Sequence, residues 1–373
     1  MTNFSKPVVV IDNGSFNLKA GFACDNHPVC IFRNTVGRPK YLQGTYGKTP
    51  YEVYVGDAAV QRIDDLDLNY PVYRGKIVHW DNMERVWHHV FYRELKAAPE
   101  DRAVLLSCAP TTTMKDKVKC CEIFFESLNT MSLCIRPQSL LALFGSGFTT
   151  GVSVDLGEDC TEIHPIYEGG SLTYANMVTN IAGTEIKNMM SENIQKRGFR
   201  RANITEQLLD NVWREAYITM DSAVPNCKKS YRRKLYIPGY ETHINVGNEA
   251  FWAGEMYFQP ELVLGEKAVD CLSVQQAIVT AIAKCDKELQ PELYEGIVVH
   301  GGMILPGFIK RLCQELELLT ERQIIIQEPT EAYALGWLGG AVFAGIIDAP
   351  KLFIAKEKFE EQGERIVRTK FIS

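Results

Sequence analysis

One pattern occurs twice in this chain and constrains its fold most: an apolar, β-branched run that ends in aspartate, then a tight turn and a second apolar run. The first copy ends in Asp12 and turns through residues 13–15. The second copy ends in Asp155 and turns through residues 156–161. Each copy is typical of two strands joined as a hairpin. Since the two aspartates lie 143 positions apart (155 − 12), about one domain length, the pattern predicts a duplicated α/β unit with a cleft between the copies.

A third element follows the two hairpins. Residues 296–300 form an apolar run typical of a strand, Gly301 and Gly302 form a turn, and apolar residues at helical spacing begin at Phe308. A strand, a Gly-Gly turn and a helix N-terminus bring backbone N–H groups close to an anion without obstruction by side chains. The ordered set of three elements therefore indicates an anion site.

The remaining patterns also fit an α/β chain. They predict a main domain boundary near residues 145–151, which separates the two copies. The expected helices cover residues 83–95, 114–128, 138–144, 183–196, 205–220, 274–285 and 308 to about 319, with further strands at 52–55 and 103–107.

Composition excludes several classes of protein. The net charge of −6 over 373 residues argues against dedicated nucleic-acid binding, because such domains are usually strongly basic. The eleven cysteines include no CxxC pair and the seven histidines show no zinc-finger spacing, which disfavours a disulfide framework and a zinc site. A reducing, intracellular setting is favoured. The uncharged run of residues 332–347 is shorter than a membrane span, so we expect a buried helix there and no membrane insertion.

Eleven segments, in order and from about residue 7 to the end, resemble the successive signatures of the actin family. They keep nearly the family's spacing, so the chain looks like a divergent actin or actin-related protein. The segments are IDNGSFNLKAGFA, VGRPK, YVGDAA, NYPVYRGKIVHWDNMERVWHHVFYREL, PQSLLALFGSG, GVSVDLGE, PIYEGGSL, NIAGTEI, FQPELVLG, KCDKELQPELY and GWLGGAVFA.

The resemblance implies the two-domain α/β fold that actin shares with Hsp70 and hexokinase. In that fold each domain has a five-stranded mixed sheet, and ATP or ADP with Mg²⁺ or Ca²⁺ occupies the cleft. The first domain would comprise residues 1–145 and 335–373, with a small inserted subdomain at about 34–70. The second would comprise residues 146–334, with an inserted subdomain at about 182–265.

The resemblance also implies roles for individual residues. Asp12 and Asp155 would hold the divalent ion through water. Ser15 and the backbone amides beside it would contact phosphate, and Lys19 would neutralise its charge. Gly157 would let the second loop approach the phosphates. The other residues expected against the nucleotide are Asn13, Gly14, Phe16, Asp159, Gly183, Trp213, Gly301 and Gly302.

Two departures from the family's pattern fall in the phosphate loops. Phe16 stands where the family has glycine after the first-loop serine, and a side chain there is strained if its φ is positive. In the second loop Asp159 replaces a glycine, and a carboxylate close to a triphosphate repels it unless the metal intervenes. We therefore expect lowered nucleotide affinity, unless Asp159 points away from the nucleotide.

A further departure concerns hydrolysis. In this family a glutamine and a histidine order the attacking water, and the glutamine corresponds to Gln138. The histidine position holds Glu162, and the nearest histidine, His164, is expected on the same strand face. Because a carboxylate can orient water or act as a base, Glu162 is the second candidate catalytic residue. We expect hydrolysis to be slow or absent.

The residues that hold the adenine in the family are changed too. A Lys-Glu pair becomes Val212-Trp213, and a lysine near the C-terminal hinge becomes Ala332. Trp213 either stacks on the base or, as a lone tryptophan on a helix, packs in the core.

Two segments bear on partners. Residues 39–51 correspond to the family's mobile loop, which inserts into the next subunit, and keep glycine and proline typical of a loop. Residues 187–234 hold eleven Lys and Arg against five Asp and Glu, and the densest part runs from Lys228 to Lys234. This stretch is either a solvated surface or a site for an acidic partner.

Two functions from different classes remain open. The first is an actin-like cytoskeletal protein that binds ATP or ADP in the interdomain cleft and assembles with actin-like subunits or a larger complex. The alternative is a non-polymerising structural subunit of a multiprotein complex, with little or no nucleotide turnover. A small-molecule kinase of the same superfamily is disfavoured because the actin signature is nearly complete. We expect a cytoplasmic, cytoskeletal location, with a nuclear one still open.

Overall fold

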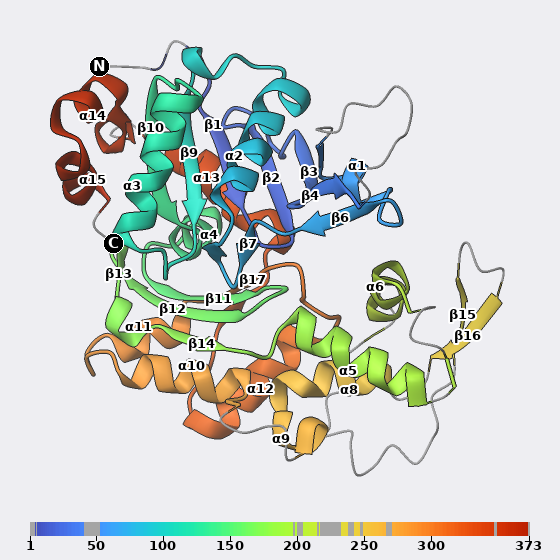
Figure 1. The fold of residues 1–373 in the computed structure, drawn as a ribbon. Coiled ribbons are helices and arrows are strands. Elements are labelled where there is room, and N and C mark those ends of the chain that lie inside the picture. The colour runs from blue at the N-terminus through green and yellow to red at the C-terminus, as the bar shows by residue number, and fades with distance from the viewer. Residues whose placement is uncertain are drawn as a thin grey trace. The chain divides into compact units, whose positions relative to one another are not determined.

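The computed structural model divides the chain into two compact units (Figure 1). The first unit comprises Met1–Thr149, Glu168–Thr173 and Tyr333–Ser373. The second comprises Thr150–Tyr167 and Tyr174–Ala332. The structure describes residues 4, 6–40, 53–196, 198–199, 204–214, 216, 233–237, 242–246, 249–265, 271–346 and 349–371.

A six-stranded sheet forms the core of the first unit, in the order β19-β10-β9-β1-β2-β3. β1 pairs in parallel with β9 and antiparallel with β2, which makes the first predicted hairpin. The apolar run before Asp12 is fully buried in β1, as expected for a strand covered on both faces. The family resemblance implies five strands, and the sixth, β19, is a two-residue edge strand. The strands are β1 (Val9–Asn13), β2 (Asn17–Phe22), β3 (Cys30–Arg33), β9 (Ala103–Cys108), β10 (Ser132–Pro137) and β19 (Ile354–Ala355).

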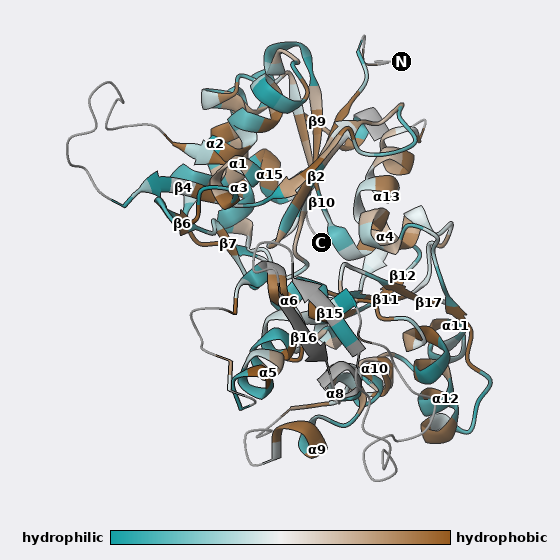
Figure 2. Ribbon diagram, turned by 90° about the vertical axis from the view of Figure 1, so that its right-hand side faces the viewer, coloured by the Kyte–Doolittle hydropathy of each residue, from teal (hydrophilic) through white to brown (hydrophobic). Residues whose placement is uncertain are grey.

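Helices cover both faces of this sheet. α13 packs on β1 and on α4, and Figure 2 shows α2 and α3 on the opposite side of the strands. The indole N–H of Trp337 on α13 donates to the carbonyl of Val10 at 3.1 Å, which ties this glycine-rich helix to β1. The buried helix expected in residues 332–347 is confirmed for Leu335–Ala344, which form α13, whereas residues 332–334 form a 3-10 turn and residue 347 lies outside the described residues. The helices are α2 (Trp80–His89), α3 (Met114–Glu122), α4 (Gln138–Gly145), α13 (Leu335–Ala344), α14 (Lys356–Gln362) and α15 (Glu364–Lys370).

Shorter elements complete the first unit. A three-stranded sheet has the order β5-β4-β6, and β7 and β8 form a separate hairpin. These elements are β4 (Val36–Pro39), β5 (Tyr54–Val55), α1 (Asp57–Val60), β6 (Leu66–Asn69), β7 (Val72–Tyr73), β8 (Lys76–Ile77), η2 (Pro99–Asp101), β13 (Gly170–Ser171) and η8 (Ala349–Leu352), while η4 (Thr173–Ala175) and η7 (Ala332–Ala334) lie where the chain passes between the units.

The second unit repeats the strand pairing of the first. β11 pairs antiparallel with β12 and in parallel with β17, as β1 does with β2 and β9. The duplication predicted from the two aspartates is therefore confirmed in the strand pairing. The sheet strands are β11 (Gly151–Leu156), β12 (Thr161–Tyr167), β14 (Met177–Thr179), β17 (Ile297–His300) and β18 (Ile326–Gln327), and β15 (Arg233–Ile237) and β16 (Thr242–Val246) form a hairpin.

Helices α10 and α11 pack on this second sheet, α10 against β12 and β14 and α11 against β11. The helices of the unit are α5 (Gly183–Lys196), α6 (Glu206–Arg214), α8 (Glu249–Phe258), α9 (Pro260–Leu264), α10 (Val274–Ala283), α11 (Gln290–Glu295) and α12 (Phe308–Thr320).

Two predicted helices are α-helical over only part of their length. The spans 83–95 and 114–128 correspond to α2 and α3, and each continues as a π-helical turn, η1 (Val90–Glu94) and η3 (Ile123–Ser127). A single π turn leaves the apolar spacing nearly unchanged, so periodicity does not reveal it. By contrast, α5 spans the predicted residues.

Two segments that bear on partners fall mainly outside the described residues. Of the predicted mobile loop at 39–51, only the first two residues are described. Of the basic run from Lys228 to Lys234, Arg233 and Lys234 are described, at the start of β15, and the side chain of Lys234 is exposed.

The cysteines in the described part of the chain are all free thiols. Burial raises the pKa of the Cys134 thiol to about 11 and that of the Cys30 thiol to about 12. These two thiols therefore stay protonated and unreactive near neutral pH. None of the described helices is long and apolar enough to cross a lipid bilayer.

Candidate functional site

A buried ion pair lies at the turn of the first hairpin. Asp12 and Lys19 are direct partners across β1 and β2, and Lys19 Nζ lies 2.9 Å from Asp12 Oδ2. The hydroxyl of Ser107 donates to Asp12 Oδ1 at 2.7 Å, so both carboxylate oxygens have partners. Asp12 is 1% exposed. The pairing brings Asp12, which is predicted to hold the cation, into direct contact with Lys19, which is predicted to bind phosphate.

Small polar groups line the turn itself. The backbone N–H of Gly75, at the β7–β8 turn, donates to the hydroxyl of Ser15 at 3.4 Å. The side-chain oxygen of Asn13 is buried and has no hydrogen-bond partner among the described residues. It is one of several such buried polar atoms in the described part of the chain, and its place at the turn makes it available to a water or a ligand.

Phe16 is accommodated without backbone strain. It is not among the described residues with positive φ, so the strain expected for a side chain at this position does not arise. The guanidinium carbon of Arg33 lies 3.4 Å from the centre of the Phe16 ring, a cation–π contact. The next residue, Asn34, donates from its side chain to the carbonyl of Gly14 at 2.8 Å. Contacts from β3 and the residue after it therefore hold this loop.

Gln138 lies close to Asp12 within the first unit. It is the first residue of α4, directly after Pro137. A Cβ atom on Gly336 of α13 would lie 3.0 Å from Gln138 Cγ and 3.2 Å from Asp12 Oδ1. Since one glycine touches both side chains, the structure brings the candidate catalytic glutamine beside the candidate metal ligand.

In the second hairpin, both acids of the loop have partners on α5. Glu158 Oε1 lies 2.9 Å from Lys187 Nζ, and the Glu158 carbonyl accepts from the N–H of Thr184 at 2.7 Å. The Thr184 hydroxyl donates to Asp159 Oδ1 at 3.5 Å. Asp159 thus lies beside the N-terminus of α5, where the helix dipole favours a carboxylate.

The predicted glycines of the second unit differ in the space around them: Gly301 leaves no room for a Cβ, whereas Gly302 faces open space. The N–H of Gly183 donates to the carbonyl of Gly157 at 3.2 Å. Gly301 has a φ of +112°, and a Cβ there would lie 2.4 Å from the Leu156 carbonyl oxygen, so only glycine fits. At Gly302 a Cβ would meet no described atom within 4 Å, so the backbone there is open to a ligand.

Glu162 and His164 form a buried pair on β12. His164 Nε2 lies 3.4 Å from Glu162 Oε2, which confirms that the two share one strand face. Their exposed fractions are 7% for Glu162 and 1% for His164. The second ring nitrogen of His164, Nδ1, has no hydrogen-bond partner in the described part of the chain.

Trp213 lies on α6 and is buried within the second unit, as is its neighbour Val212. The enclosed indole is typical of a core tryptophan, the second of the two interpretations that the sequence leaves open. Stacking of Trp213 on an adenine stays a prediction.

Two residues beside Asp155, Ser153 and His300, are not among the predicted site residues. His300 Nε2 lies 2.8 Å from Ser153 Oγ, and His300 Nδ1 lies 3.7 Å from Asp155 Oδ1. A signal for both exists in the sequence, since a serine interrupts the apolar run before Asp155 and a histidine closes the run before Gly301.

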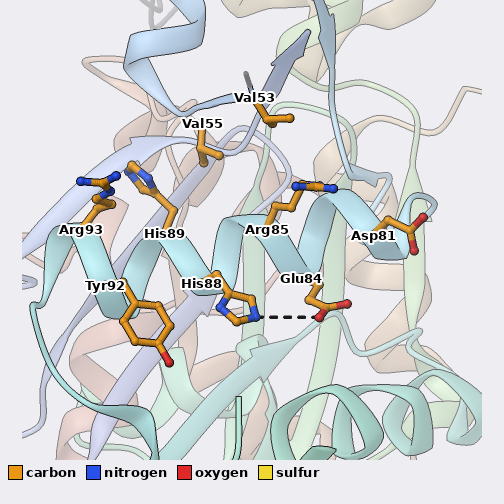
Figure 3. Close-up of a pocket in the computed structure, with 9 residues that line it drawn as sticks. All are labelled: Val53, Val55, Asp81, Glu84, Arg85, His88, His89, Tyr92 and Arg93. Atoms are coloured by element: carbon orange, nitrogen blue, oxygen red, sulfur yellow. Dashed lines mark ion pairs between the residues drawn. The ribbon is translucent and has the colours of Figure 1, made fainter. Parts of the chain in front are cut away.

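A separate hollow of about 540 Å³ lies along α2 in the first unit (Figure 3). Figure 3 shows Arg85 of α2 and Arg93 of η1 on the side that faces Val55, with acidic Glu84 on α2. None of the predicted phosphate-loop residues lines this hollow. Its lining carries both acidic and basic side chains, so its charge favours neither an anionic nor a cationic ligand.

Comparison with protein families decides what these features belong to. The family model described as Actin matches residues 5–233 and 202–372 of the chain. The chain belongs to the actin family. Actin-family proteins typically bind a nucleotide with a divalent cation, and they commonly interact with actin-like subunits or complexes. This actin-family protein has the two-domain α/β fold that its sequence predicts.

The donor groups of this actin-family chain fit such a ligand. The buried carboxylate of Asp12, the ammonium of Lys19 and the unpaired acceptor of Asn13 meet at one hairpin turn. The backbone of Gly302 is open at another turn. Among the described residues, no three His, Cys, Asp or Glu side chains gather into a direct metal site.

Proposed function

We propose that this actin-family protein binds ATP or ADP with Mg²⁺ or Ca²⁺ in the cleft between its domains. The observation that carries the proposal is the buried Asp12–Lys19 pair at a hairpin turn, with 2.9 Å between the charged groups. A buried pair of this kind costs desolvation free energy and is weak support for stability alone. Its position at a hairpin turn, where backbone N–H groups can donate to an anion, favours recognition of phosphate and cation.

The proposed roles follow the chemistry of each group. Asp12 and Asp155 hold the cation through water, and Lys19 binds phosphate oxygen. Ser15 donates its hydroxyl to phosphate. The bound nucleotide supplies the phosphoanhydride bond that hydrolysis would break. The remaining proposed contacts are Asn13, Gly14, Phe16, Gly157, Asp159, Gly183, Trp213, Gly301 and Gly302.

Turnover is proposed to be slow. Gln138 orients water through its side-chain amide, which can donate and accept. Glu162 offers Oε1 as the proton acceptor, since Oε2 faces His164. An ionised carboxylate accepts hydrogen bonds but donates none, so Glu162 orients water differently from the family's histidine.

Assembly is proposed to follow the family. The chain associates with actin-like subunits or a larger complex as a cytoplasmic, cytoskeletal protein. The second candidate, a structural subunit that does not polymerise, is favoured by the one observation that Glu162 stands in the place of the family's histidine.

Purification in the presence of ATP and Mg²⁺ tests these alternatives. Nucleotide released on denaturation and identified by chromatography would support binding, and none would contradict it. Phosphate release together with pelletable polymer would overturn the structural-subunit alternative. Absence of both, with nucleotide still bound, would favour it.

A graded series at Gly302 tests the nucleotide site without a change in the fold. A Cβ at Gly302 meets no described atom within 4 Å, and its φ is not positive, so Gly302→Ala and Gly302→Val should keep the thermal midpoint. If the nucleotide packs on this backbone, each larger side chain takes up space that the nucleotide needs, so affinity for a fluorescent ATP analogue should fall stepwise. We expect a loss of about tenfold or more for valine, which equals about 1.4 kcal/mol of binding free energy. Equal affinity across the series would contradict the proposed placement.

The run from Lys228 to Lys234 is proposed as a docking site for an acidic partner. The variant Arg232→Glu/Arg233→Glu should lose such a partner in a pull-down, because two of its cations become anions. The partner captured by wild type should dissociate more readily at high salt, as expected for binding between opposite charges. Unchanged partners and unchanged salt dependence would contradict the proposal.

A further inference from the structure

A cluster of polar side chains is buried in the sheet of the second unit, at the end of the strand that carries Asp155. Ser153 and Asp155 are two residues apart on β11 and therefore share a face. His300 is the direct partner of Asp155 on the parallel strand β17. Ser153 has no exposed surface and His300 is 1% exposed.

His300 bridges the other two residues through its two ring nitrogens. Nε2 lies 2.8 Å from Ser153 Oγ, a hydrogen bond, and Nδ1 lies 3.7 Å from Asp155 Oδ1. A carboxylate next to Nδ1 favours the proton on Nδ1, so the Ser153 hydroxyl then donates to Nε2. The serine thereby fixes the plane of the imidazole, and the imidazole directs an N–H toward Asp155.

The same three residue types activate the serine nucleophile of hydrolases. That role does not fit here, because Ser153 lies within a central strand and has no exposed surface that a substrate could reach. In a hydrolase the carboxylate orients the histidine, which activates the serine. Here the serine orients the histidine, which contacts the carboxylate.

A second neighbour restrains the same carboxylate oxygen. A Cβ on Gly301 would lie 2.6 Å from Asp155 Oδ1, so the backbone of Gly301 lies close to this oxygen and leaves no room for a larger residue. Oδ1 is therefore confined between the imidazole of His300 and the backbone of Gly301. Burial of a serine and a histidine costs desolvation free energy, which their hydrogen bond only offsets. Apolar side chains at these positions would stabilise the sheet without that cost.

We propose that His300 is a positioning residue, held by Ser153, that fixes the orientation of Asp155 for the divalent cation of the bound nucleotide. The proposal rests on the nucleotide binding proposed above. Partners of direct metal ligands commonly change metal affinity by ten- to a hundredfold when they are removed, and since Asp155 is proposed to act through water, we expect an effect at the lower end of that range. The effect should therefore appear in the Mg²⁺ dependence of nucleotide binding.

Two substitutions separate the two contacts of His300. The side-chain nitrogen of asparagine is three bonds from Cα, as is Nδ1 of histidine, so His300→Asn keeps a donor toward Asp155. The side-chain oxygen of glutamine is four bonds from Cα, as is Nε2, and it accepts hydrogen bonds, so His300→Gln keeps an acceptor for the Ser153 hydroxyl and loses the donor toward Asp155. A residue that only stabilises the sheet would tolerate glutamine at least as well as asparagine.

The experiment measures the Mg²⁺ concentration that gives half-maximal binding of a fluorescent ATP analogue, together with the thermal midpoint of each variant. We expect His300→Gln to raise that concentration about tenfold. We expect His300→Asn to stay within about threefold of wild type, even where its thermal midpoint is the lower of the two.

Each other result has a defined meaning. Unchanged Mg²⁺ dependence in His300→Gln, with wild type binding the analogue, overturns the positioning role alone. Equal losses in both variants that follow their thermal midpoints also overturn it, since they show a structural role. A wild-type protein that binds no ATP analogue overturns the proposed function, and the positioning role with it.

Discussion

Replacing Gly339 by valine is expected to prevent the first unit from folding. A Cβ at this position would lie 1.6 Å from the carbonyl oxygen of Leu141 and 2.4 Å from its carbonyl carbon. Both atoms belong to the backbone of α4, so no side-chain rotation relieves the overlap, and α13 must move away from α4. That movement would break the Trp337 hydrogen bond to Val10 and open the core on one face of the sheet.

The expected cost exceeds about 4 kcal/mol, which is a large share of the roughly 5–15 kcal/mol that stabilises a folded protein. Gly345→Val, the same substitution at the end of the same helix, is the matched control. A Cβ there would meet its nearest atom, the carbonyl oxygen of Val342, at an ordinary 3.4 Å. Soluble yield and thermal unfolding followed by circular dichroism measure both variants. A soluble Gly339→Val protein with a thermal midpoint within a few degrees of the control would contradict the expectation.

The elements set by local patterns could be predicted from the sequence. The first hairpin follows from apolar runs on either side of a turn, and α5 and α12 follow from apolar residues at helical spacing. The sequence also places Asp12 and Lys19 near one turn. Their direct pairing follows only from the strand register, which sets residue 12 opposite residue 19.

Contacts between distant segments could not be predicted in this way. Ser153 and His300 are 147 positions apart, and they meet only because β11 and β17 pair in parallel. No periodicity within either strand encodes that pairing. The buried pair of Arg311 and Glu255, 56 positions apart on α12 and α8, is hidden for the same reason.

Backbone conformation is a further limit of inference from sequence. Phe16 in place of glycine predicts strain only if φ is positive, and residue type alone does not fix φ. The structure gives Phe16 an ordinary φ and a contact with Arg33, a residue of β3 seventeen positions along the chain. The tolerance of the loop for a side chain thus depends on a neighbouring strand.

Arg311→Met is expected to destabilise the second unit by about 3–5 kcal/mol at pH 8, because it leaves the carboxylate of Glu255 buried without its cation. Arg311 is 1% exposed and Glu255 is 2% exposed. Arg311 Nη2 lies 3.2 Å from Glu255 Oε1, and its Nε donates to Glu315 at 2.6 Å. The guanidinium also lies over the ring of Phe258, so the arginine joins α12 to α8 through both charge and packing.

The destabilisation should depend on pH in a defined direction. Burial raises the pKa of Glu255 above its usual value of 4.5, and Arg311 opposes that rise. An acid whose pKa is raised in the folded state binds more protons there, so stability falls as the pH rises from 4.5 through the folded pKa. Removal of Arg311 raises the pKa of Glu255 in the folded state further, so the pH range over which stability falls extends to higher pH. The difference in unfolding free energy between Arg311→Met and wild type should therefore be smaller at pH 5 than at pH 8, as measured by urea unfolding.

The double variant Arg311→Met/Glu255→Leu separates the charge from the packing. With the carboxylate gone, no buried acid remains at this position, and apolar side chains of similar volume fill the space, an exchange that is often close to neutral. We expect the double variant to recover most of the stability that the single variant loses. Its difference in unfolding free energy from wild type should be the same at pH 5 and pH 8, except for the part that comes from the titration of Glu255 in wild type. If the double variant is as unstable as Arg311→Met, packing of the arginine rather than its charge holds α12 to α8. Equal destabilisation of the single variant at pH 5 and pH 8 would likewise remove Glu255 as the cause.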